Sequence, residues 1–199
     1  DINNMLYDTV ENILNTYDSP ADYADLSMEL LKVFAIETPF TEDEYRGMPK
    51  KEAFDRVFAA VNEAFRRKGE RIIEIALPVI KDWVENRGAG QKGGRILVPI
   101  TDGKRVFNIP CDINEAYNTE CRSILKEWHK AILLVTIDEV WKEHLRELDQ
   151  LRQSVQNASY EQKDPLVIYK VESFHLFEGA MNTLNVKAAS SLLSGQIFR

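Results

Sequence analysis

Side chains that could do chemistry are few and scattered in this sequence. The histidines are His129, His144 and His175, and the cysteines are Cys111 and Cys121. Their spacing matches no common zinc site, and nothing in the sequence supplies the base and orienting group that a nucleophilic cysteine needs. We therefore predict no catalytic residue and no metal ligand, and we interpret His144 as a core histidine satisfied by a neighbour.

Nucleotide binding finds no support either. Gly103-Lys104 is the only Gly-Lys pair, and it lacks the following Ser or Thr and the preceding glycine-spaced loop of a P-loop. The basic run Arg66-Arg67-Lys68 is interpreted as the solvated face of a helix rather than an anion site. The sequence thus predicts no cofactor for this chain.

Composition excludes further classes of protein. The 25 Lys and Arg residues are outnumbered by 32 Asp and Glu residues, and the net charge of −7 argues against nucleic acid as the main partner. Residues 188–198 form the longest uncharged stretch, which is too short for a membrane-spanning helix of about 20 residues. Two isolated cysteines fit a reducing, cytoplasmic setting. With only 9 Gly and 7 Pro in 199 residues, long helices are expected rather than a many-stranded barrel.

The first half of the chain has the periodicity of amphipathic helices. Apolar residues recur at intervals of three and four over residues 2–17, 20–34 and 50–76. Pro78 is expected to kink or interrupt the third helix. Residues 38–49 are interpreted as a connector.

A change of character follows between residues 87 and 112. After a glycine-rich stretch, the apolar runs 96–100 and 106–109 flank Asp102-Gly103, which is a strong two-residue turn signal. The pattern predicts one isolated β-hairpin near residues 95–110. Because two strands alone are only marginally stable, the hairpin should lie against the surrounding helices.

The second half predicts a long helical hairpin. Residues 113–156 contain neither Gly nor Pro, so one helix can run from Asp112 to about Gln156, and Asp164-Pro165 can begin another antiparallel to it. The predicted fold is mainly α. The seam between the two helices is predicted from a heptad-like spacing at Leu134, Ile137, Trp141, His144, Leu148, Leu151 and Val155.

Tyr160 stands alone among polar residues at the predicted tip of this hairpin, residues 157–164. One interpretation is a tyrosine folded back over the helix ends. The other is an exposed ring that touches a flexible polypeptide, since an aromatic side chain offers a large contact area at low entropic cost. The composition of this segment does not decide between the two interpretations.

The same region resembles a known family. The resemblance is carried by Trp141-Lys142-Glu143-His144-Leu145, Leu151-Arg152-Gln153, Tyr160-Glu161-Gln162-Lys163-Asp164-Pro165 and Glu172-Ser173-Phe174. These residues are similar to the C-terminal region of the SecA family, the ATP-driven motors of bacterial preprotein export. Residues 40–120 match less well, and the β-hairpin looks like an elaboration of one lineage. Since the sequence lacks an initiating Met, we expect it to be a piece of a longer protein.

The resemblance implies a domain organisation and partners. Residues 1–17 and 120–199 would form a helical scaffold, and residues 18–119 an inserted helical wing. The hairpin would be the two-helix finger, whose tip residues Tyr160, Gln162 and Lys163 contact the translocating preprotein and the mouth of the SecY channel. ATP and Mg²⁺ would belong to nucleotide-binding domains of the same parent chain that are outside this sequence, and the whole would work in the cytoplasm, peripherally at the inner membrane.

A second function class fits the same pattern. A coiled-coil adaptor or scaffolding module could use the heptad seam to bind a helical partner. Such a module would leave its seam unsatisfied until the partner binds, whereas a finger should satisfy it internally.

Overall fold

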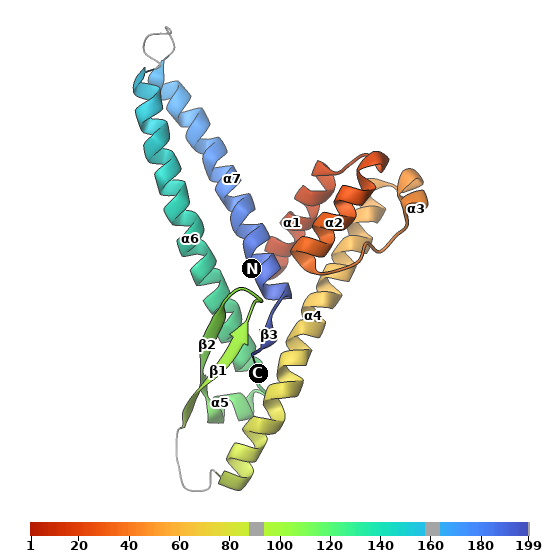
Figure 1. Cartoon of the computed structure of the whole chain (residues 1–199), viewed down its shortest axis with the longest axis vertical. Coiled ribbons are helices and arrows are strands. Elements are labelled where there is room, and N and C mark those ends of the chain that lie inside the picture. Colours follow the sequence, from red (N-terminus) through yellow and green to blue (C-terminus); the bar gives the residue numbers. More distant parts are fainter. Residues whose placement is uncertain (88–93, 158–163, 199) are drawn as a thin grey trace.

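The computed structural model describes residues 1–87, 94–157 and 164–198 and is mainly helical, as predicted. Two arms diverge from a common base, one formed by the long helices α6 and α7 and the other by α4 with the short helices packed on it (Figure 1). The elements in chain order are α1 (Ile2–Thr16), η1 (Pro20–Asp22), α2 (Tyr23–Phe34), α3 (Glu42–Gly47), α4 (Lys50–Asp82), η2 (Trp83–Arg87), β1 (Arg95–Thr101), β2 (Val106–Asp112), α5 (Ile113–Asn118), α6 (Arg122–Asn157), α7 (Pro165–Leu193) and β3 (Gln196–Ile197).

Two of the short helices begin with a capping box. Ser19 caps η1 in a reciprocal capping box with Asp22, and α2 follows without a gap. Thr41 forms the same kind of box with Glu44, so α3 occupies part of the segment that was predicted to be a connector. The apolar faces of α1, α2 and α4 meet the end of α7 in one core, with Leu6, Val10, Leu26, Leu30, Val57, Val61 and Leu193 among the buried residues.

Pro78 does not interrupt helix α4. The helix continues through this proline to Asp82 and then passes into a turn of π-helix, η2. Proline removes one backbone donor, yet Pro78 itself is exposed and its neighbours Ile72, Ala76 and Ile80 are buried. Burial of that apolar face outweighs the single lost hydrogen bond.

The β-hairpin is not isolated, because the C-terminal residues add a third strand in the order β2-β1-β3. β1 pairs with β2 from Arg95 opposite Asp112 to Thr101 opposite Val106, and β3 pairs with the end of β1 at Ile100 and Thr101. The Phe198 N–H donates to the Pro99 carbonyl at 2.9 Å. Since Pro99 has no N–H to return that bond, the pairing of β3 weakens at this position.

The predicted single helix after Asp112 is broken into α5 and α6. Asp112 does cap α5, accepting a hydrogen bond from the Glu115 N–H. The break lies at Glu120 and Cys121, whose φ values of 50° and 64° are left-handed, and the Cys121 N–H donates to the Ala116 carbonyl at 2.7 Å. Neither residue is a glycine, so the sequence contains no signal for this corner.

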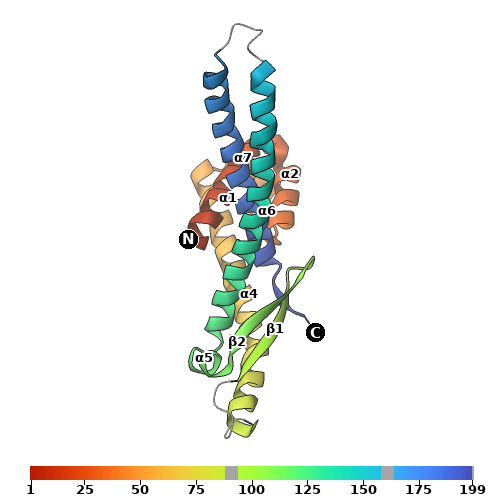
Figure 2. The ribbon, with the colours of Figure 1, turned by 90° about the vertical axis from the view of Figure 1, so that its left-hand side faces the viewer.

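The sheet lies against α6 near the base of the long helices, while α6 and α7 run side by side beyond it (Figure 2). Buried residues of both arms belong to one continuous core, in which Trp128 and Ile132 of α6 meet Ile100 and Ile109 of the sheet. No helix within the described residues has both the length and the apolar character that crossing a bilayer requires.

Candidate functional site: the long helical hairpin and its base

The long hairpin consists of two helices packed antiparallel, as the sequence predicted. α6 is continuous over 36 residues, and α7 is capped as expected by Asp164, whose side chain accepts from the Leu166 N–H at 2.9 Å. The ends of α6 and α7 that face each other lie far from the sheet (Figure 1). The pair therefore forms a rod anchored at one end.

The seam prediction is only partly confirmed. His144 and Val155 are buried, and Leu148 and Leu151 are partly buried. The prediction is wrong for three positions, Leu134, Ile137 and Trp141, which are 58%, 46% and 50% exposed.

The buried face of α6 instead steps by four residues along the helix, through Ile132, Thr136, Val140 and His144. A heptad seam needs one partner along its whole length. Here α7 leaves α6 to pack on α1 and α2, and the base of α6 packs on β2. The buried face therefore turns around the helix, and the stripe that continues the heptad spacing faces outward.

His144 lies in the interface between the two helices. It is 4% exposed, with the Trp141 ring at 5.4 Å and the Phe177 ring of α7 at 6.0 Å between centroids. Its Nδ1 atom is buried without a hydrogen-bond partner among the described residues, and the side chain lines a cavity of about 310 Å³. The prediction of a core histidine is confirmed, but the neighbour expected to satisfy it is not found in the described part of the chain.

The predicted contact residues at the tip cannot be placed. Tyr160, Gln162 and Lys163 fall outside the described residues. The structure therefore fixes the rod that would carry them and the residues Asn157 and Asp164 that border them.

The turn of the β-hairpin, residues 102–105, contacts α6 near its middle and α7 near its C-terminal end. Asp102 Oδ1 accepts from the backbone N–H groups of Lys104 and Arg105 at 3.0 and 2.8 Å, and Oδ2 accepts from Ser191 Oγ of α7 at 3.0 Å. The Arg105 guanidinium forms an ion pair with Glu139 of α6. One short turn thus links α6 to α7.

The Asp102 carboxyl is held in its ionised form by this network. Only 5% of the residue is exposed, and burial by itself raises the pKa of a carboxyl. The hydrogen bonds from the Arg105 and Lys104 backbone and from Ser191, together with the Arg105 charge, outweigh burial and lower the pKa of Asp102 below its ordinary value. A buried carboxylate with this many donors is a stable anchor for the turn.

Burial shifts the pKa values of the two thiols and of His129. Burial raises the pKa of the Cys111 thiol to about 11 and also raises that of Cys121, so both stay protonated near neutral pH. Burial lowers the pKa of His129, whose ring packs on Phe65 at 5.2 Å. Across residues 1–87, 94–157 and 164–198, no group of His, Cys, Asp and Glu side chains could hold a metal ion.

Sequence reasoning missed the link between the turn and the helices. Asp102 was identified only as a turn residue, although an aspartate in a tight turn has a second carboxylate oxygen free to accept another bond. The partner Ser191 is 89 positions away in the sequence, and no local pattern marks it.

Comparison with known proteins gives one consistent result. Residues 1–196 match the family described as "SecA Wing and Scaffold domain", and this range includes the hairpin and residues 40–120, which the initial resemblance covered poorly.

Curated relatives agree. The chain is 47% identical over 197 residues to the "Protein translocase subunit SecA" of Parabacteroides distasonis and 49% identical to that of Bacteroides thetaiotaomicron, in each case covering 99% of this chain and 17% of the relative. It is 36% identical to the corresponding protein of Flavobacterium psychrophilum, of which it covers 18%. The chain thus spans less than a fifth of the length of these relatives. Given the family match and these identities, the chain belongs to the SecA wing and scaffold domain family.

Proposed function

We propose that this chain is the part of a protein-export motor that touches the polypeptide being moved, with the α6–α7 hairpin acting as a finger. The observation that carries the proposal is the long antiparallel pair that extends from the base and brings Asn157 and Asp164 to its far end (Figure 1). The residues between them, 158–163, would contact the translocating preprotein and the mouth of the SecY channel. The chain would work at the cytoplasmic face of the inner membrane without crossing it.

Stiffness supports this role. A finger must transmit displacement from its base to its tip, and a continuous helix with a packed partner resists bending. The described part of α6 contains neither Gly nor Pro and is held near its middle by the Arg105–Glu139 ion pair. A push applied to the base would then reach the tip.

The outward stripe of the hairpin supports a place within a larger protein. Large apolar side chains on α6 and α7 are exposed, namely Leu134, Ile137, Trp141 and Leu145 on α6 and Leu166, Val167, Val171, Phe174, Phe177 and Met181 on α7. Patches of this kind mark surfaces that other elements cover. We propose that they pack on the remainder of the longer protein, including the nucleotide-binding domains that would bind ATP and Mg²⁺. A coiled-coil adaptor would also expose such a stripe, but the family match over residues 1–196 favours the motor.

The test is a substitution at the tip of the full-length motor. Tyr160→Ala should slow preprotein transport about tenfold, which corresponds to the loss of an aromatic contact worth about 1.4 kcal/mol. Basal ATP hydrolysis should stay near the wild-type rate, because the nucleotide sites are elsewhere. Transport into membrane vesicles and ATP turnover would be measured on the same preparations.

Tyr160→Phe is the matched control, since it keeps the ring and should keep most of the transport. Transport unchanged in Tyr160→Ala would remove the tip from the mechanism. An equal loss of transport and of basal ATP hydrolysis would point to a structural defect instead.

A further inference from the structure

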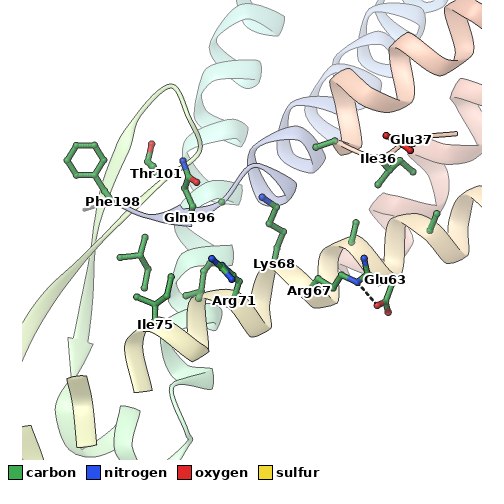
Figure 3. A pocket seen from close by; sticks show the side chains of 16 residues that line it. Ile36, Glu37, Glu63, Arg67, Lys68, Arg71, Ile75, Thr101, Gln196 and Phe198 are labelled. Atoms are coloured by element: carbon green, nitrogen blue, oxygen red, sulfur yellow. Dashed lines mark hydrogen bonds and ion pairs between the residues drawn. The ribbon is translucent and has the colours of Figure 1, made fainter. Parts of the chain in front are cut away.

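A second feature of the surface is a cleft of about 950 Å³ between the two arms, apart from the hairpin tip. Its floor is the face of α4 from Ala60 to Ile75, and its walls are the segment after α2, residues 35–37, and the C-terminal residues 195–198 (Figure 3). The floor contains the apolar side chains Ala64, Ile72 and Ile75. The cleft is thus an open groove along a helix.

The charges of the cleft are unbalanced at one end. Arg67 is neutralised by Glu63, with Nε to Oε1 at 2.8 Å. The side chains of Lys68 and Arg71 form no ion pair or hydrogen bond with any described residue. Both side chains extend from α4 toward the segment that carries Gln196 (Figure 3). The sequence interpretation of this basic run as a solvated face is thus incomplete, because Lys68 is only partly exposed and lines a cleft.

A carboxylate that pairs with no cation among the described residues also lines the cleft, but at the opposite end. Glu37 lies beside Ile36 on the α2 side, away from Arg71 (Figure 3). A ligand with negative charge would therefore be attracted to the end near β3 and repelled from the end near α2. The net charge of the chain is −7, so this end of the cleft differs in sign from the chain as a whole.

The C-terminal wall adds main-chain groups. Because the Phe198 N–H donates to β1, alternation along the strand turns the N–H and C=O of Ile197 away from β1. β3 is the edge strand of the sheet, and Ile197 lines the cleft. A free strand edge beside a groove is a common way to hold an extended peptide.

We propose that this cleft binds an extended polypeptide segment that carries several carboxylates. The carboxylates meet Lys68 and Arg71, the main chain meets Ile197, and apolar atoms lie on Ile72 and Ile75. The lining residues of α4 span about 22 Å at 1.5 Å per residue. At about 3.3 Å per residue, an extended segment of six or seven residues fills that length.

The experiment uses the 199-residue chain and two synthetic heptapeptides. In one peptide Glu alternates with Ala, and in the other Gln replaces Glu at the same positions. Isothermal titration calorimetry at low salt should give a dissociation constant at least about tenfold smaller for the Glu peptide, and the difference should shrink as salt screens the charges. In NMR spectra, the Ile197 amide should shift with both peptides if both bind. Equal affinity of the two peptides, or no binding of the Glu peptide, would overturn the proposal.

Charge reversal localises the effect. The double variant Lys68→Glu, Arg71→Glu should lose the preference for the Glu peptide and should prefer a third peptide with Lys at those positions. Lys51→Glu is the control, since Lys51 is an exposed lysine of the same helix outside the cleft. An equal loss in the control would show a nonspecific effect of net charge and would contradict the assignment.

Competition experiments distinguish a peptide site from a site for inorganic phosphate or for anionic lipid. Inorganic phosphate at the concentration of the peptide, and vesicles containing anionic lipid, should leave the peptide bound. Complete displacement by phosphate would make the cleft a site for small anions, and binding to vesicles in place of the peptide would make it a lipid site. Either result would overturn the polypeptide proposal.

Discussion

Trp128→Ala is expected to lower the free energy of unfolding by about 3 to 5 kcal/mol, the usual range for removing a buried tryptophan. Trp128 is 1% exposed and packs edge to face on Phe107 of β2, with ring centroids 5.3 Å apart. Its ring also lies so close to Gly195 that a Cβ there would come within 3.1 Å of it. The Trp128 side chain thus packs between α6, the sheet and the C-terminal segment. Its removal leaves a cavity bordered by all three elements.

The chain offers a matched control in the same helix. Trp141 is 50% exposed, so Trp141→Ala should cost about 1 kcal/mol or less in this chain. Denaturant unfolding followed by circular dichroism would give both values under the same conditions. Equal losses would contradict the placement of one tryptophan in the core and the other on the surface. The original seam prediction, which buried Trp141, would then be the better description.

The second large effect is expected at the turn that joins the helices. Asp102→Asn should lower the free energy of unfolding by about 2 to 3 kcal/mol at pH 7, because hydrogen bonds to a charged acceptor are each worth about 1.5 to 3 kcal/mol and some are retained by the amide. Ser191→Ala should cost less on its own. In the double variant the costs should not add, since both substitutions alter the same contact between residues 102 and 191.

This effect should depend on pH in a defined direction. The pKa of Asp102 is lowered in the folded chain, so its stabilisation is fully present above the unfolded pKa of about 3.9 and is lost as pH falls through the folded pKa. The difference between wild type and Asp102→Asn should therefore be constant from pH 5 to 7 and shrink below about pH 4. Asp138→Asn, at an exposed ion pair with Lys142, should show little change at any pH. A difference that grows on acidification would contradict the lowered pKa.

Local signals predicted many boundaries of the fold. Asp112 and Asp164 cap the elements that they were expected to begin, and a turn forms where Asp102-Gly103 predicted one, with Gly103 at a φ of 84°. The turn has four residues, 102–105, between Thr101 and Val106 rather than the two that were predicted. Each of these rests on one side chain and its neighbours in sequence. Boundaries set by distant contacts could not be predicted in this way. The two-residue strand β3 exists because β1 offers an edge, and the corner at Glu120 and Cys121 has no turn residue to announce it.

The candidate site, too, was predicted from local signals only in part. The antiparallel hairpin followed from the absence of helix breakers and the Asp164-Pro165 start. The face of α6 that the hairpin buries could not be predicted in this way. α6 carries two apolar stripes, and the sequence does not show which of them meets α7. Leu134, Ile137 and Trp141 have the spacing of a seam, but they face the side left open within this chain. This chain covers less than a fifth of the length of its relatives. Burial of these three side chains would require contacts with residues from outside the chain.

The turn at residues 102–105 limits how the two long helices can move relative to each other. Since Asp102 bonds Ser191 of one helix while Arg105 pairs with Glu139 of the other, axial sliding of α6 past α7 would break one of these links. Tilting both helices together breaks neither. If the pair rotated about the sheet, the ends of α6 and α7 far from the sheet would move farther than the ends near it (Figure 1).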